Sequence, residues 1–230
     1  MRRRTTAGAV LALALALALA LAASPAAAAV ISGTGGDDTL TGTTSADIIR
    51  ARGGDDVVDG RGGRDRLDGG AGSDTVRGGR GRDVGDGGWG RDVLGGGDGT
   101  DLLFGGGAQD LVFGGAGGDS LSGGPGNDLL RGGAGDDFLT DGVITEISDE
   151  PGDDVLRGGY GDDFFGVTGG RDQVFAGSGD DLVKTLNDGL PDVFDCGVGA
   201  DRILYYEVEG VGGLDPADVL IGCERVKVVR

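Results

Sequence analysis

An aspartate recurs every nine residues through most of this chain. Counted from Gly33, residues 33–140 divide into twelve consecutive nonapeptides, exemplified by GGDGTDLLF at 96–104. After eight further residues, 141–148, the same phase returns in four units over 149–184, and two degenerate units occupy 187–204. The sixth position of every unit is aspartate: Asp38, Asp47, Asp56, Asp65, Asp74, Asp83, Asp92, Asp101, Asp110, Asp119, Asp128, Asp137, Asp154, Asp163, Asp172, Asp181, Asp192 and Asp201.

The eighth position of the units is apolar with one exception, Gly85. An aspartate and an apolar residue recur two places apart in nearly every unit. This indicates a repeated structural unit, because a low-complexity sequence without a fold would not keep both position six and position eight constant in type. The pattern therefore argues against disorder, although the 54 glycines and the low aromatic content, 5%, would by themselves be compatible with it.

Composition also limits the partners of the chain. Its net charge is −19, which repels nucleic acids and anionic membranes and favours cations. There is no histidine, so zinc and softer metals lack their usual imidazole ligand, and calcium, which prefers oxygen ligands, is favoured.

The nonapeptides resemble the repeats-in-toxin (RTX), or haemolysin-type, repeat G-G-x-G-x-D-x-U-x, closely over 33–184 and more loosely to 204. The resemblance implies an all-β, right-handed parallel β-roll, in which two units form an eighteen-residue coil. It also implies several Ca²⁺ ions bound between stacked turns. We expect six residues of each unit to form the turn and three to form a strand, with the eighth residue in a thin core.

Bound calcium would also supply free energy of folding that such a roll lacks without it. One buried aliphatic side chain per unit contributes roughly 1.5–3 kcal/mol, whereas ordering each backbone residue costs about 1–2 kcal/mol. Rows of aspartates about 4.8 Å apart would add repulsion. We therefore predict that the position-six aspartates of the first sixteen units, Asp38 to Asp181, are calcium ligands, together with main-chain oxygens of the turns. The alternative is that these aspartates only cap turns.

Some units depart from the pattern. Ser45 and Ala108 replace the glycine at position four, which predicts strained turns or weaker sites there, and the site near Asp47 is expected to be poor. Gly85 predicts a gap in the core. The insertion at 141–148 is expected to bulge from one turn and to interrupt the row of ions.

Both ends of the chain differ from the repeats. Residues 1–29 combine a basic start, an apolar run and a small-residue site, which predicts a secretory signal peptide cut after Ala29 and, from its composition, a bacterial source. No second apolar run could span a membrane, so we expect an exported protein. We assign 30–184 to the roll and 185–230 to degenerate repeats and a C-terminal cap, pinned by a disulfide between Cys196 and Cys223.

The sequence indicates a calcium-binding repeat protein rather than an enzyme. Histidine-dependent triads and zinc sites are excluded, and no nucleophile elbow or P-loop occurs. The alternative function is an adhesin or cell-envelope interaction module, for which the outward apolar residues Val93, Leu102, Phe104, Leu111 and Phe113 could provide a docking patch for a protein or cell-surface partner. A third reading, a polysaccharide-acting enzyme, depends on the acidic cluster in and just after the insertion: Glu146, Asp149 and Glu150.

Overall fold

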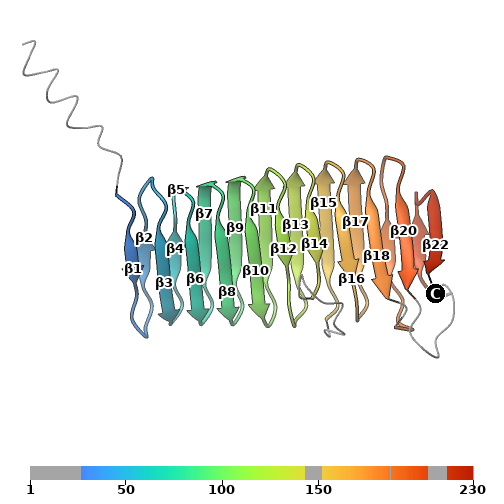
Figure 1. The fold of residues 1–230 in the computed structure, drawn as a ribbon. Coiled ribbons are helices and arrows are strands. Elements are labelled where there is room, and N and C mark those ends of the chain that lie inside the picture. Colours follow the sequence, from blue (N-terminus) through green and yellow to red (C-terminus); the bar gives the residue numbers. More distant parts are fainter. Residues whose placement is uncertain (1–26, 143–151, 187, 207–216, 230) are drawn as a thin grey trace, which may run out of the picture.

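The computed structural model describes residues 27–142, 152–186, 188–206 and 217–229. All regular structure within these ranges is β-strand, wound into a solenoid with two parallel sheets along its sides (Figure 1). The chain passes from one sheet to the other with each nonapeptide, so two units complete one coil. The predicted all-β parallel β-roll is confirmed. No helix in the described ranges is long and apolar enough to cross a bilayer.

Each sheet has its strands in sequence order, taking alternate strands of the chain. The first sheet contains β1 (Val30–Ser32), β3 (Ile48–Gly53), β6 (Arg66–Ala71), β8 (Val84–Trp89), β10 (Leu102–Gly107), β12 (Ser120–Ser122), β14 (Phe138–Thr140), β16 (Phe164–Val167), β18 (Leu182–Leu186), β20 (Arg202–Tyr206) and β22 (Arg225–Val229). The second sheet contains β2 (Thr39–Thr41), β4 (Val57–Asp59), β7 (Thr75–Gly81), β9 (Val93–Gly99), β11 (Leu111–Ala116), β13 (Leu129–Ala134), β15 (Val155–Tyr160), β17 (Gln173–Ser178), β19 (Val193–Asp195) and β21 (Val219–Ile221), with β5 (Gly62–Gly63) paired to β7.

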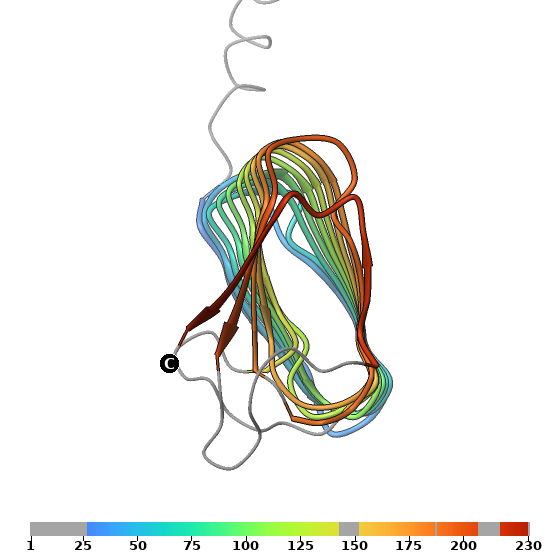
Figure 2. The ribbon, with the colours of Figure 1, turned by 90° about the vertical axis from the view of Figure 1, so that its right-hand side faces the viewer.

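The register follows the repeat. Leu103 pairs with Leu121, eighteen residues on, and across the insertion Leu139 pairs with Phe165. The eight extra residues therefore leave the stacking of the coils unchanged. Seen along the solenoid axis, the coils superimpose with an elongated cross-section (Figure 2).

Many of the strands are longer than the three residues that the sequence predicted, whereas three residues are found in β1, β2, β4, β12, β14, β19 and β21. β10 covers not only the expected three residues but also Gly105, Gly106 and Gly107, the start of the following unit. Glycine allows this because neighbouring coils approach closely. A Cβ at Gly97, which has a φ of 110°, would overlap the carbonyl oxygen of Gly79 on the preceding coil. The turn itself is correspondingly shorter than six residues.

The core is a file of position-eight side chains between the sheets, from Ile49 to Ile203, all buried. The space predicted to be a gap at Gly85 is partly occupied by a neighbouring side chain. A Cβ there would lie 2.9 Å from Cδ2 of Leu103, which leans from the next coil into the room that glycine leaves. The Leu103 side chain thus takes up part of the volume that a larger side chain at position 85 would fill.

The core thickens toward the C-terminus. Buried side chains stand where most earlier units have the position-one glycine, including Val167, Ala176 and Cys196, and Tyr205 packs edge-on against Phe194 with ring centroids 6.1 Å apart. The described part of the segment predicted as a cap continues both sheets, because β21 pairs with β19 and β22 pairs with β20. The last strands therefore form one more coil.

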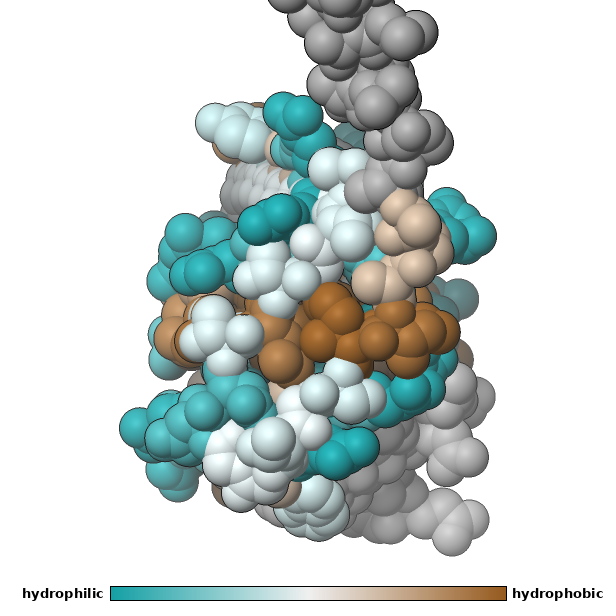
Figure 3. Space-filling view, turned by 90° about the vertical axis from the view of Figure 1, so that its left-hand side faces the viewer, coloured by the Kyte–Doolittle hydropathy of each residue, from teal (hydrophilic) through white to brown (hydrophobic). Residues whose placement is uncertain are grey.

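The other end of the solenoid exposes part of its core. Figure 3 looks onto this end, where an apolar band lies between polar surfaces. Ile31 of β1 and Leu40 of β2 are only partly buried there, and Val30 is 73% exposed.

Candidate metal centre

The position-six aspartates form two rows along the solenoid, one at each edge where the chain passes between the sheets. All eighteen lie in the described residues, and seventeen are buried, while Asp38 on the first coil is half-buried. One row runs Asp38, Asp56, Asp74, Asp92, Asp110, Asp128, Asp154, Asp172 and Asp192, and the other runs Asp47, Asp65, Asp83, Asp101, Asp119, Asp137, Asp163, Asp181 and Asp201.

Within a row, one carboxylate oxygen has a structural task. The backbone N–H of each aspartate, except the last in its row, donates to Oδ1 of the row's aspartate on the next coil, for example from Asp92 to Asp110 at 2.8 Å. The bond persists across the insertion, where Asp137 donates to Asp163 at 2.8 Å. The two rows of aspartates are therefore continuous across the insertion.

The other oxygen has no such task. In fourteen of these aspartates Oδ2 is buried and has no hydrogen-bond partner among the described residues. A buried polar atom without a partner is costly, and a row of them is a strong indication of a missing ligand. The turn-cap and metal-ligand interpretations are thus compatible, because the cap uses Oδ1 and leaves Oδ2.

The glycine at position one makes room next to this oxygen. A Cβ at Gly105 would lie 2.7 Å from Oδ2 of Asp110 in the same unit and 2.7 Å from the carbonyl oxygen of Gly123 on the next coil. The same pair of oxygens flanks Gly69, formed by Asp74 and the carbonyl of Gly87, again at 2.7 Å each. A carboxylate and a main-chain oxygen therefore face one small space, and both are hard donors of the kind that calcium takes.

The residues present fit calcium in their chemistry as well. The chain has no histidine, and both cysteines are in a disulfide, so the donors at the turns are oxygens. When bound, calcium would neutralise neighbouring carboxylates and join successive coils. Asp110 and its counterparts would hold it through Oδ2.

Electrostatics in the rows favours a bound cation or proton. Burial raises the pKa of Asp110 to about 7, helped by the charges of Asp128 and Asp92 and opposed by the hydrogen bond from the Asp92 backbone. Burial raises the pKa of Asp172 to about 9, with the charges of Asp141, Asp192 and Asp154 acting in the same direction. The folded roll therefore resists carrying these carboxylates as free anions.

The first two units are built differently. At Asp47, burial acts to raise the pKa, but hydrogen bonds from the Thr43 and Ala29 backbones and from the Thr43 hydroxyl outweigh it, so the pKa is lowered. Thr43 N–H donates to Oδ2 of Asp47 at 2.5 Å, and Thr34 N–H donates to Oδ2 of Asp38 at 2.6 Å. These two carboxylates thus have partners that the regular ones lack.

Sequence reasoning missed two acidic residues in these rows. Asp218 extends the first row, since its Oδ1 accepts from the Asp192 backbone at 2.9 Å. The sequence feature that could have predicted this role is an aspartate followed two residues later by an apolar residue, Asp218 and Leu220, although the glycines of the regular repeat do not precede them. Asp141 is the other: it lies in a buried trio with Asp154 and Asp172, whose carboxylate oxygens are within 4.8 Å of one another.

Other predicted features are placed as follows. Cys196 and Cys223 form the predicted disulfide, with Cα atoms 5.1 Å apart. Ala108 has a φ of 84°, a conformation unfavourable for a residue with a Cβ, whereas Ser45 is not among the residues with positive φ. Residues 1–26 of the predicted signal peptide, and the acidic cluster at 146, 149 and 150, lie outside the described residues.

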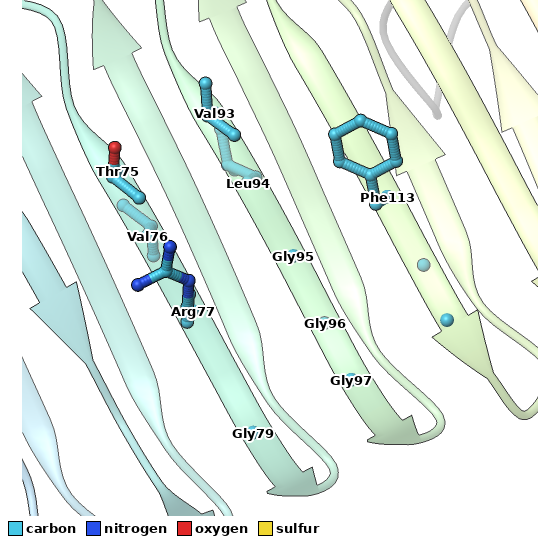
Figure 4. A pocket seen from close by; sticks show the side chains of 12 residues that line it. Thr75, Val76, Arg77, Gly79, Val93, Leu94, Gly95, Gly96, Gly97 and Phe113 are labelled. Carbon is cyan, nitrogen blue, oxygen red and sulfur yellow. The ribbon is translucent and has the colours of Figure 1, made fainter.

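The predicted apolar patch is divided between the two sides of the solenoid. Leu102 and Phe104 are on β10 of the first sheet, whereas Val93, Leu111 and Phe113 are on β9 and β11 of the second sheet. On the second sheet, Gly95 leaves a shallow hollow, and a Cβ built there would meet nothing within 4 Å. Arg77 and Phe113 flank it from the neighbouring strands (Figure 4).

The stacked coils and the rows of buried carboxylates define this molecule as a parallel β-solenoid with oxygen-lined turns suited to cations. The chain belongs to the RTX calcium-binding nonapeptide repeat family, whose profile matches residues 32–67, 59–94, 86–121, 113–142 and 149–183, more than half of the chain. It is therefore a calcium-binding repeat protein. A search of curated proteins found no match to it.

Proposed function

We propose that the chain is an exported, non-enzymatic protein that folds into its β-roll when calcium ions bind between successive coils. The observation that carries this proposal is the set of fourteen buried Oδ2 atoms that have no hydrogen-bond partner among the residues that the structure describes. Without an ion, folding would bury two rows of like charges, each pressed against its neighbours by the stacking of the coils. With calcium, the same rows supply ligands, so the free energy of binding becomes free energy of folding.

The calcium-dependence is tested by far-ultraviolet circular dichroism of the complete exported chain, starting in chelator and raising free calcium, with magnesium as the control. We expect a cooperative change from coil to β-structure at roughly 10⁻⁴–10⁻³ M calcium, the range of extracellular modules. A β-spectrum in chelator that calcium leaves unchanged would contradict the proposal. Magnesium should act poorly, because it is smaller and demands near-octahedral geometry.

Export follows in this proposal from the composition of residues 1–29. The test is N-terminal sequencing of the protein recovered outside the producing cells. We expect the sequence to begin at Val30. Retention in the cell, or an unprocessed Met1, would contradict this part of the proposal.

A second candidate function, a calcium-stabilised cell-envelope interaction module, is favoured by the hollow at Gly95. It combines an open apolar floor with the cation of Arg77 and the ring of Phe113 at its sides (Figure 4). In a sedimentation assay with cell envelopes, Arg77→Ala should weaken binding by the calcium-loaded protein, whereas Arg50→Ala, on the other sheet, should not. Equal binding by both variants would exclude this hollow as the contact.

A further inference from the structure

Asp141 occupies a place that glycine holds on the preceding coil. Its N–H donates to Gly166 O at 3.3 Å, and its carbonyl accepts from Gly124 N at 2.6 Å, so its backbone is part of the ladder between coils. Gly142 is also buried, and the residues outside the described structure begin only after it. Asp141 is therefore a coil residue, although the sequence assigns it to the start of the insertion.

The side chain at this place points into the row of position-six carboxylates. On the preceding coil, a Cβ at Gly123 would lie 2.5 Å from Oδ2 of Asp128. At Asp141 a carboxylate extends in this direction, and one of its oxygens lies within 4.8 Å of oxygens of Asp154 and Asp172. Two successive aspartates of the row, Asp154 and Asp172, thus have a third carboxylate beside them, whereas a regular pair of successive aspartates has none among the described residues.

The Asp141 carboxylate is held rigidly. Oδ1 accepts from Gly142 N at 2.6 Å and from Thr168 Oγ1 at 3.2 Å, while Oδ2 accepts from Thr168 N. Thr168 belongs to the next coil and is itself buried. The donors come from two coils, so the position of the carboxylate is fixed before any ligand arrives.

Within the described part of the chain, no basic side chain forms an ion pair with the trio. All three aspartates are at most 2% exposed, and among the described residues the one ion pair joins Arg80 to Asp98 on the surface. Oδ2 of Asp172 is buried and has no hydrogen-bond partner among the described residues. A buried anionic oxygen of this kind indicates that the trio binds a cation.

We propose that Asp141, Asp154 and Asp172 form a distinct calcium site, tighter than the regular sites of the roll. Affinity of such sites rises with the number of charged ligands and with rigidity, and this step has an additional carboxylate and a fixed one. Asp141 and Asp154 also flank residues 143–151, so an ion here joins the two ends of the inserted segment. The site rests on the proposed calcium binding, and we expect its affinity to exceed that of the regular sites roughly tenfold.

The experiment equilibrates the complete exported protein with a series of chelator-buffered calcium concentrations and measures bound calcium per chain by atomic absorption. The wild type should keep one ion, together with the folded coils that surround it, at free calcium about tenfold below the level at which the other ions leave. Asp141→Asn, which keeps the size of the side chain, should lose this retention and leave the remaining ions unchanged. Asp98→Asn removes the same charge from the exposed surface and should behave as the wild type.

The outcomes separate this site from the general function. If neither the wild type nor any variant binds calcium, the proposed function is wrong. If calcium binds but the wild type has no distinct tight ion, or if Asp141→Asn retains it, the trio is not the site while calcium-dependent folding stands. Circular dichroism at saturating calcium checks that the Asp141→Asn variant is folded. If that variant does not fold, Asp141→Gly takes its place in the experiment, because glycine is the residue at the equivalent position 123 of the preceding coil.

Discussion

The backbone amide of Asp92 donates a 2.8 Å hydrogen bond to Oδ1 of Asp110, one coil further along, while Oδ2 of Asp110 is buried without a partner. The two oxygens of one carboxylate therefore have different environments. One stabilises the stacking of coils directly, and the other is available for calcium. Because the arrangement repeats along both rows, it allows the two contributions to be separated by substitution.

Asp110→Asn and Asp110→Ala should differ in a calcium-dependent way. The asparagine keeps an oxygen for the Asp92 amide but loses the charge, so it should raise the calcium concentration needed for folding. The alanine additionally leaves a buried N–H unpaired, at a further cost of about 1–3 kcal/mol in the free energy of unfolding. Urea unfolding at saturating calcium measures the difference, and equal losses from both variants would contradict separate roles for the two oxygens.

The glycine at position one should be required by the site rather than by the backbone alone. Gly105→Ala places a methyl group 2.7 Å from both Oδ2 of Asp110 and Gly123 O, so it should weaken calcium binding and destabilise the roll. Gly95→Ala is the matched control, because its Cβ would meet nothing within 4 Å, and it should be neutral or stabilising by about 0.4–1 kcal/mol. Calcium titrations followed by circular dichroism compare the two. Similar behaviour would mean that the space beside Gly105 holds no ion.

The effect of pH should reverse with calcium. Burial, with like charges nearby, raises the pKa of Asp74 to about 6, of Asp110 to about 7 and of Asp154 to about 8, from an ordinary value of 3.8. The calcium-free folded state therefore binds more protons than the unfolded chain, so its stability is full below about pH 4 and is lost as pH rises toward 6–8. In chelator, acidification should promote β-structure.

In saturating calcium the sign is opposite, because protons compete with the ion for Oδ2. The loaded roll should lose stability on acidification through the same range. Thermal unfolding between pH 4 and 8, with and without calcium, provides the comparison. Parallel pH profiles under the two conditions would show that calcium does not use these carboxylates.

The disulfide should stabilise the C-terminal coils in particular. Replacing Cys196 and Cys223 by alanine removes a link across 27 residues, worth about 3 kcal/mol if loop closure in the unfolded chain dominates. Hydrogen exchange should then rise in β19 to β22 and stay unchanged in β6 to β11. Uniform loss of protection along the solenoid would indicate instead that the roll unfolds as one unit.

The periodicity of the sequence predicted much of this structure. A constant phase of nine specifies which residues stack, and the alternation around position eight specifies which side chain enters the core, from Ile49 to Ile203. The aspartate column likewise predicted both rows. These features depend on side chains that repeat, so the sequence alone makes them visible.

Other features depend on residues whose pattern is absent or broken. Gly105 to Gly107 extend β10 although glycines show no alternation of polar and apolar side chains. Asp141 was not predicted as a ligand because the sequence cannot decide which of the inserted residues remain in the coil. The different tasks of Oδ1 and Oδ2, and the way Leu103 fills the space beside Gly85, follow only from atomic positions.

The most direct measurement of the central claim is the electron density of a crystal of the calcium-loaded protein, with anomalous scattering to identify the ions. The account predicts two rows of calcium peaks, each bonded at about 2.3–2.6 Å to the Oδ2 of a position-six aspartate and to a main-chain oxygen of a position-one residue. Turns without calcium, in which Oδ2 instead bonds to water or to protein donors, would contradict it.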